Sequence, residues 1–196
     1  MLMNESMSHD HEVQLVNERL LLRAFRLEDA DEIYQAVCES KPELTRWLPW
    51  CHTEYAPSDT LEFLNLRGQA FRQDQEHAFA IFERNSGRFA GATGINQIDR
   101  HARRANLGYW LRTDCTGKGF ATQATLLVAH WAFDQLGLER IEIVAATENI
   151  ASQRVAMRAG ATREGIARRR LRMGDEQRDA VVFSLVPSDL AGKNSR

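Results

Sequence analysis

Cysteine, proline and long apolar runs are scarce in this sequence. Its 196 residues include three cysteines and four prolines, and no apolar run approaches the roughly 18 residues of a membrane-spanning helix. The cysteines are odd in number and far apart (Cys38, Cys51 and Cys115), which argues against a disulfide framework and against metal-ligand spacing. We therefore expect a cytoplasmic protein with no metal site and no membrane partner.

Net charge is also small. The formal charge is −2 at pH 7, with 43% hydrophobic and 27% charged residues. This balance is typical of a soluble globular domain and gives no overall field that would attract nucleic acid. We expect a disordered polar tail over residues 1–12, one domain over 13–190, a flexible C-terminus over 191–196, and no direct nucleic-acid partner.

Alternating and helical patterns succeed one another along the chain. Strands are expected over residues 18–26, 77–84, 88–99, 104–112, 139–147 and on both sides of Gly174. Helices are expected over residues 27–40, from a capping box at Asp59 and Glu62 to about residue 72, over 119–136, and from an Asn149 cap to Gly160. Residues 41–59 hold three of the four prolines without a clear period, which predicts a surface loop or broken helix. The order predicts an α/β fold, with a mixed, mostly antiparallel sheet and flanking helices.

The stretch "TDCTGKGFATQ" lies between an expected strand and an expected helix. Gly117 and Gly119 allow backbone N–H groups to turn inward at a helix N-terminus, which is a favourable place for phosphate. The candidate donors are Thr116, Gly117, Lys118, Gly119, Phe120 and Ala121, with the Thr122 hydroxyl nearby. The pattern matches neither a P-loop nor a dinucleotide fingerprint. A purely structural turn is the alternative interpretation.

Three segments together resemble the GNAT acyltransferase superfamily, and more narrowly the Rim-type N-terminal acetyltransferases of ribosomal proteins. They are "ANLGYWLRTDCTGKGFATQA", "NIASQRVAMRAGATREG" and the early "ERLLLR". The resemblance extends from "RLLLRAFRLEDA" to "DAVVFSLV", nearly the whole chain. It implies a GNAT-like fold, acetyl-CoA as acyl donor without a metal, an amine acceptor and a homodimer.

The resemblance also implies roles for particular residues. The backbone of Leu111, Arg112 and Thr113 is expected to bind pantetheine, and the glycine loop to bind the CoA pyrophosphate. Asn149 is expected to contact the pantetheine arm. Ser152 is expected near the sulfur, as the catalytic group that assists the leaving thiolate; an ordinary helix-start serine is the alternative. Asp114 stands where the family usually has Arg or Gln.

A general base is harder to assign. Two positions where relatives suggest a glutamate hold Asn106 and Leu171 here. Glu43, His52 and Glu54 are alternative candidates, and each is otherwise a solvated loop residue. These departures put a dedicated carboxylate base in doubt.

Two further groups of side chains are open to more than one interpretation. Trp47 and Trp50 are candidates to line an acceptor pocket, or are buried anchors of their loop. The basic run over residues 168–172 is expected to form an exposed strand face, offset by the nearby acids Asp175, Glu176 and Asp179; a ribosomal or acidic partner is the alternative. Cys115 has no His–acid pair beside it in sequence, so we do not expect a covalent nucleophile.

The function expected from these features is acetyl transfer from acetyl-CoA to a primary amine by direct attack. The N-terminal α-amine of a protein, such as a ribosomal protein, is the favoured acceptor. The alternatives are an acetyltransferase for a small amine or antibiotic, and a CoA-binding sensor without catalysis.

Overall fold

The computed structural model describes residues 13–191. The tail expected over residues 1–12, and all but the first residue of the C-terminus expected over 191–196, lie outside the described residues. The strands are β1 (Gln14–Val16), β2 (Leu20–Ala24), β3 (His77–Glu83), β4 (Phe89–Asp99), β5 (Arg104–Leu111), β6 (Arg140–Ala146), β7 (Thr162–Met173) and β8 (Glu176–Leu185). The α-helices are α1 (Ala30–Glu39), α2 (Lys41–Trp47), α3 (Pro57–Arg72), α4 (Phe120–Leu136), α5 (Ile150–Ala159) and α6 (Pro187–Leu190), and two 3-10 turns are η1 (Leu27–Asp29) and η2 (Thr113–Cys115).

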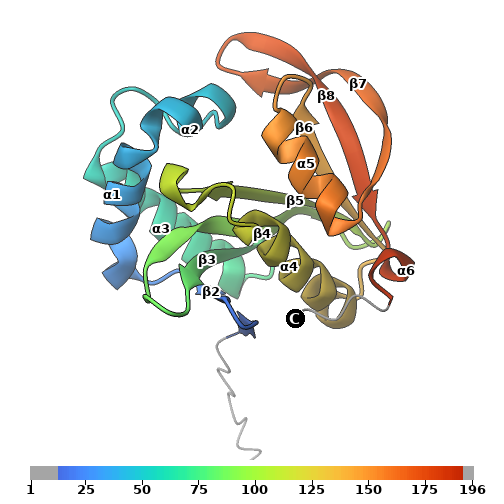
Figure 1. Ribbon diagram of the computed structural model, residues 1–196, viewed down its shortest axis with the longest axis horizontal. Helices are drawn as coiled ribbons and strands as arrows, with labels where there is room; N and C mark the ends of the chain where they lie inside the picture. Colours follow the sequence, from blue (N-terminus) through green and yellow to red (C-terminus); the bar gives the residue numbers. More distant parts are fainter. Residues whose placement is uncertain (1–12, 192–196) are drawn as a thin grey trace, which may run out of the picture.

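The strands form one sheet in the order β1-β2-β3-β4-β5-β6-β8-β7. Every neighbouring pair is antiparallel except β5 and β6, which run parallel and are joined through α4. In Figure 1, α4 crosses in front of the sheet and α3 lies behind it. The expected mixed α/β fold with a mostly antiparallel sheet is therefore confirmed.

Each face of the sheet has its own apolar cluster because side chains alternate along a strand. On β3, Phe79 and Ile81 pack toward α4 and α5, whereas Ala80 and Phe82 pack toward α1 and α3. The apolar stripe of α4 faces the first of these clusters, with Phe120, Ala124 and Val128 fully buried. The two helical layers are thus held by opposite faces of the same strands.

Several boundaries differ from the sequence predictions. The short strand β1 was not expected. Residues 41–59 form a broken helical segment as expected, with α2 over 41–47, an irregular stretch over 48–56 and the start of α3. Pro42 lies at the start of α2, where proline is tolerated. The predicted capping box of α3 is wrong. The helix begins at Pro57, and the Asp59 carboxylate accepts the Ala56 N–H at 2.7 Å, so Asp59 lies inside the first turn.

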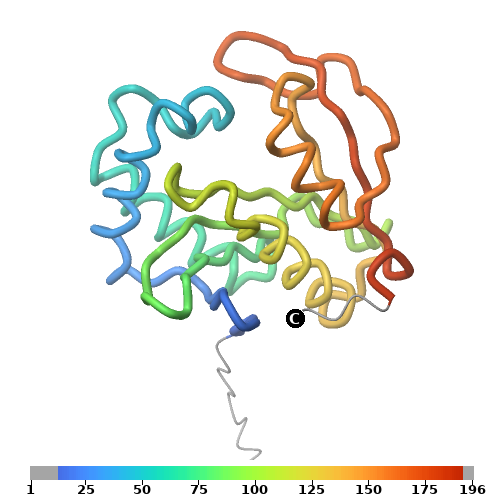
Figure 2. The backbone as a smooth tube through the Cα atoms, viewed as in Figure 1, coloured from blue at the N-terminus to red at the C-terminus, as the bar shows by residue number. Residues whose placement is uncertain are grey.

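The start of α5 and the end of α4 agree with prediction. Asn149 caps α5 by accepting the Ser152 N–H at 3.0 Å. Gly137 ends α4 in a left-handed conformation at φ 62°. The end of the sheet from which α5 begins is its open end, and in Figure 2 the α1–α2 region and the β7–β8 hairpin lie on either side of it. No helix within residues 13–191 is long and apolar enough to cross a membrane.

Candidate active site

The two parallel central strands separate after a short pairing. β5 and β6 pair only at three positions, the last being Asn106 opposite Glu142. β5 continues to Leu111 and β6 to Ala146 without pairing with each other, so the two strands splay apart toward their C-terminal ends. α4 and α5 both begin beyond this splay, so the backbone of β5 is left open between them.

The backbone of β5 determines which of its groups face the splay. Arg112 N–H donates to Ala90 O on the β4 side at 2.9 Å, and N–H directions alternate along a strand. Leu111 N–H therefore faces the splay. Thr113 N–H is also occupied, because it donates to Ser40 Oγ at 3.0 Å. Of the three residues expected to bind pantetheine through the backbone, Leu111 alone has its N–H free for this purpose.

Six consecutive N–H groups, over residues 117–122, have no hydrogen-bond acceptor within the described chain. Gly119 is the N-cap of α4 at φ 82°, and Gly117 precedes it at φ 73°. A Cβ added at either glycine would meet no atom within 4 Å. Thr116 is the exception among the expected donors, because its N–H donates to Thr113 O at 3.2 Å. The loop therefore offers a row of unsatisfied donors at a positive helix end, which suits an anion.

The side chains of this loop are engaged elsewhere. Phe120 is fully buried, with the Arg19 guanidinium 4.8 Å from its ring centroid, so only its backbone can serve a ligand. Lys118 is exposed, and its Nζ lies 5.9 Å from the same ring. These contacts fix the start of α4 without occupying its N–H groups.

Ion pairs anchor the loop to the neighbouring elements. Asp114 Oδ2 accepts from Arg88 Nη1 at 2.5 Å, and this hydrogen bond lowers the pKa of Asp114. Arg112 is buried and pairs with Glu39 at the end of α1. Asp114 thus holds the loop in place rather than reaching toward the open N–H groups. Burial raises the pKa of the Cys115 thiol, which disfavours the thiolate that a nucleophile would need.

Tyr109 is a residue of the site that the sequence analysis missed. Its hydroxyl lies 2.9 Å from Ser152 O, to which it donates, and 3.1 Å from Ser152 Oγ. Burial raises the pKa of Tyr109 to about 12, so the hydroxyl stays protonated. With Asn149 holding the Ser152 N–H, the serine is fixed at its N–H, carbonyl and hydroxyl groups. The signal in the sequence was a tyrosine inside a strand, two residues before Leu111, whose N–H faces the splay.

The two candidate acceptor tryptophans have different surroundings. Trp50 is 38% exposed and its ring centroid lies 5.7 Å from that of Trp110 on β5. Trp47 stacks under Arg46, whose guanidinium lies 4.6 Å from its ring centroid. The structure therefore connects Trp50, but not Trp47, to the strand that borders the splay.

The candidate bases are also dispersed. Glu43 Oε2 accepts from Thr113 Oγ1 at 3.0 Å, which places it beside the loop. His52 Nε2 lies 3.5 Å from Asp59 Oδ2 near the start of α3, and Glu54 is exposed. Asn106 donates to Asn96 Oδ1 at 3.0 Å. Of the three side chains proposed as alternatives, Glu43 is the one that contacts the loop.

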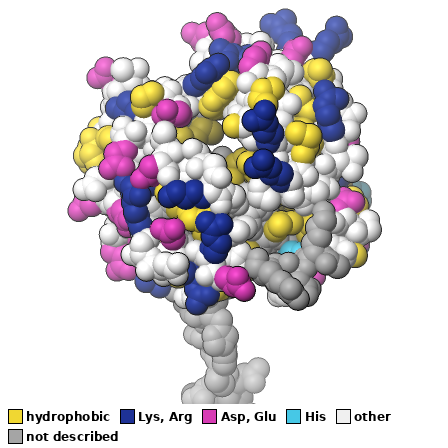
Figure 3. All heavy atoms as spheres, in the orientation of Figure 1, with side chains coloured by type: hydrophobic (Ala, Val, Ile, Leu, Met, Phe, Trp, Pro, Cys, Tyr) yellow, Lys and Arg dark blue, Asp and Glu magenta, His cyan; other side chains and the backbone are white. Residues whose placement is uncertain are grey.

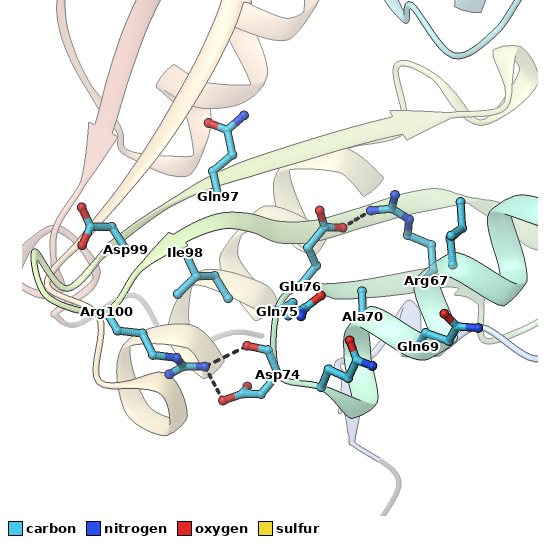
Figure 4. Close-up of a pocket in the computed structure, with 12 residues that line it drawn as sticks. Arg67, Gln69, Ala70, Asp74, Gln75, Glu76, Gln97, Ile98, Asp99 and Arg100 are labelled. Atoms are coloured by element: carbon cyan, nitrogen blue, oxygen red, sulfur yellow. Dashed lines mark hydrogen bonds and ion pairs between the residues drawn. The ribbon is translucent and has the colours of Figure 1, made fainter.

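A cavity of about 990 Å³ is a different feature. It lies between the C-terminal end of α3 and the end of β4, near the start of β5 rather than its splayed end (Figure 4). Its charged groups already pair with one another, Arg67 with Glu76 and Arg100 with Asp74. Within residues 13–191, no group of three or more His, Cys, Asp or Glu side chains could hold a metal ion. The splay is therefore the better candidate for chemistry.

The surface around the splay is hollowed. Figure 3 shows a depression between the part that carries α1 and α2 and the part that carries α5, β7 and β8. Hydrophobic side chains are visible in it, and Lys and Arg side chains lie around it. Such a surface could hold an elongated, partly apolar and anionic ligand.

Comparisons with known proteins agree with this geometry. A family model described as an acetyltransferase (GNAT) domain matches residues 19–162. The N-acetyltransferase p20 of Bacillus licheniformis is 33% identical over 184 residues, covering 91% of this chain and 98% of that protein. A ribosomal-protein-serine acetyltransferase of Escherichia coli is 25% identical over 171 residues, covering 87% and 94%. The structure of the microcin C7 self-immunity acetyltransferase MccE, in complex with acetyl-CoA and AMP, shares the fold with a TM-score of 0.82 at 24% identity, covering 87% of this chain and 93% of that one.

Proposed function

This chain belongs to the GNAT family and is an acetyl-CoA-dependent N-acetyltransferase, and we propose that its acceptor is the N-terminal α-amine of a protein, such as a ribosomal protein. The observation that carries the donor assignment is the row of six unpaired N–H groups beside the splayed strands. The similarity to the Escherichia coli ribosomal-protein-serine acetyltransferase supports the choice of acceptor.

In the proposed donor site, the N–H groups of the glycine loop bind the pyrophosphate of CoA. The complex of MccE with acetyl-CoA supports this choice of donor. Asn149 would bind the pantetheine arm and Leu111 its thioester end, since both residues border the splay. Arg112 and Thr113 would shape the site rather than bind the donor through N–H, because those N–H groups are occupied. The proposed donor-site residues are Leu111, Arg112, Thr113, Thr116, Gly117, Lys118, Gly119, Phe120, Ala121, Thr122 and Asn149.

The chemical step requires a polarised thioester carbonyl and a stabilised leaving thiolate. Leu111 N–H would donate to the carbonyl oxygen as negative charge develops there. The Ser152 hydroxyl, which donates to the Tyr109 oxygen at 3.1 Å in this structure, would turn to donate to the sulfur, while Tyr109 keeps its hydrogen bond to the Ser152 carbonyl at 2.9 Å and so positions the serine. Because Tyr109 has a pKa of about 12, it would remain neutral throughout and act as a positioning residue.

The amine must be neutral to attack. An α-amine with a pKa of about 7.8 is roughly a tenth neutral at pH 7, whereas a lysine amine near 10.4 is neutral in about one molecule in 2,500. Asn106 and Leu171 stand where relatives suggest a glutamate, so we propose that the α-amine reacts without a strong carboxylate base. Trp50 and Trp47 are the proposed acceptor-binding side chains, of which Trp50 has the better support through its contact with Trp110.

The proposed enzyme is a single domain over residues 13–190 that works in the cytoplasm as a homodimer. Light scattering coupled to gel filtration measures the subunit number. A monomer across the micromolar range would contradict the homodimer without affecting the donor site.

An acceptor screen with acetyl-CoA tests the proposed function. We expect release of free CoA with short peptides that have a free N-terminus, and little release with polyamines or aminoglycosides. Faster turnover of a polyamine or aminoglycoside would instead identify a small-amine acetyltransferase. Tight acetyl-CoA binding without turnover of any acceptor would identify a CoA sensor.

A further inference from the structure

The basic run of β7 is arranged as a bulge. Ala167 pairs with Ala180 and Leu171 with Arg178, so the three residues between them on β7 face only Asp179 on β8. These three residues are Arg168, Arg169 and Arg170. Bulges of this kind turn side chains away from their regular alternation and are frequent beside active sites. The expected exposed strand face is present over these residues, but the bulge interrupts its alternation.

The bulge is held in a strained conformation. Arg169 has φ 52°, in the left-handed region that residues other than glycine rarely adopt. Asp179 Oδ1 accepts the Arg169 N–H at 2.8 Å and so stabilises this conformation. Backbone strain of this type is unfavourable and tends to persist where it serves a function.

The three guanidinium groups lack the carboxylate partners that the sequence suggested. Asp175 lies 3.5 Å from Arg172, and Glu176 lies 2.9 Å from Arg178. Asp179 is engaged by a backbone N–H. Within residues 13–191, no carboxylate pairs with Arg168, Arg169 or Arg170, and all three are exposed. Three adjacent like charges repel one another, so an external anion would relieve this repulsion.

The bulge lies at the same end of the sheet as the splay. Thr147 N–H donates to Asp179 O at 3.2 Å, and Thr147 precedes the Asn149 cap of α5 by two residues. β8 separates β7 from β6, so the bulge lies two strand spacings, about 10 Å, from the end of β6. In Figure 1 the tip of the β7–β8 hairpin faces α2 across the open end of the sheet.

The chemistry of the bulge suits a short acidic segment. Guanidinium groups bind carboxylates and phosphates through paired hydrogen bonds. A nucleic acid needs an extended basic surface, whereas this chain has a net charge of −2 and its unpaired arginines here are confined to three adjacent positions. An extended peptide covers 10 Å in about three residues. Resting on the proposed function, we propose that Arg168, Arg169 and Arg170 bind carboxylates at about the third to sixth positions of the acceptor protein.

Two peptides that differ only in these carboxylates test the assignment. Both begin with the same free serine, and one has Asp or Glu at positions 3–6 where the other has Asn or Gln. We expect kcat/KM for the acidic peptide to be at least about tenfold higher at low salt, and the difference to shrink at about 0.5 M NaCl because the contacts are exposed. The triple variant R168Q/R169Q/R170Q should reduce the ratio to about one. Arg163→Gln is the matched control, because Arg163 is exposed on the same strand outside the bulge, and it should preserve the ratio.

Direct binding separates failure of this inference from failure of the proposed function. Fluorescence anisotropy with an N-acetylated acidic peptide measures affinity without turnover. Weaker binding to the triple variant but not to Arg163→Gln supports the arginine site, even if no peptide is acetylated. An acid preference that survives in the triple variant, or its absence in the unmodified protein, would overturn the assignment. A tenfold loss of acetyl-CoA affinity in the triple variant would also overturn the assignment, because the arginines would then bind a phosphate of acetyl-CoA. Tighter binding to an RNA oligonucleotide than to the peptide would overturn it as well, because the bound anion would then be an RNA phosphate.

Discussion

The proposed donor side and the proposed acceptor side of this molecule present different kinds of binding groups. At the start of α4, the groups that can bind a ligand are backbone N–H groups over residues 117–122. Across the splay, the candidate groups are side chains, the Trp50 ring and the three arginines of the β7 bulge. Backbone donors depend on conformation, whereas side-chain contacts depend on residue identity. The donor side can therefore be shared widely among relatives while the acceptor side adapts to each substrate.

The largest effect on ligand binding is expected at the glycine loop. Gly119→Val should weaken CoA binding by at least about 100-fold, because a branched side chain is strained at φ 82° and would fill the space before the N–H groups. Gly87→Val is the matched control. Gly87 has φ 68° and equally open surroundings but lies in the β3–β4 turn. Calorimetry should show a loss of affinity in the first variant only. Near-normal affinity in folded Gly119→Val would remove the loop from the donor site.

Removal of the Ser152 hydroxyl should affect turnover rather than donor binding. We expect Ser152→Ala to lower kcat by roughly 10- to 100-fold with little change in acetyl-CoA affinity, since the hydroxyl acts on charge that develops at sulfur. Tyr109→Phe should lower kcat by about 5- to 10-fold. In a double variant the two effects should be less than additive, because Tyr109 acts through Ser152. Full additivity, or unchanged kcat in Ser152→Ala with chemistry rate-limiting, would reduce the pair to a structural contact.

Trp50 and Trp47 are expected to contribute unequally to acceptor binding. Trp50→Ala should raise KM for a peptide acceptor by about 5- to 10-fold, because its partly exposed ring packs on Trp110 beside the splay. Trp47→Ala is the comparison variant and should have a smaller effect. Acetyl-CoA affinity should stay near normal in both. A larger effect from Trp47→Ala would move the acceptor surface toward α2.

The smallest effect concerns the attachment of β7 to the sheet. Arg140 pairs with both carboxylate oxygens of Glu164 at 2.6 Å, and this pairing lowers the pKa of Glu164 to about 2. A lowered pKa gives stabilisation that is complete above the ordinary value of 4.5 and is lost as the pH falls toward about 2. Glu164→Gln should therefore cost about 0.5–1 kcal/mol at pH 7, a modest value because the pair is partly exposed, and less near pH 3. A cost independent of pH would show that the ion pair contributes nothing.

The donor side was more predictable from sequence because local residues determine it. Gly117, Gly119 and the Asn149 cap specify backbone conformations through their neighbours in the chain, and the resemblance to the GNAT family, which the family model confirms, supplied their use. The Tyr109–Ser152 contact joins residues 43 positions apart and depends on how β5 and α5 pack. The bulge depends on the register of β7 against β8, which alternation alone does not specify.

The relative rates of an α-amine and a lysine amine test the central claim most directly. One short peptide has a free N-terminus, and its twin has a blocked N-terminus and one lysine. We predict that the first reacts much faster and that its kcat/KM rises with pH and levels off near the pKa of its own amine, about 7.8. The difference in neutral amine at pH 7 is on the order of 300-fold, comparable to the contribution of a typical general base. A faster reaction with the blocked lysine peptide, or a plateau well below pH 7, would show that the enzyme has a strong base and would contradict this account.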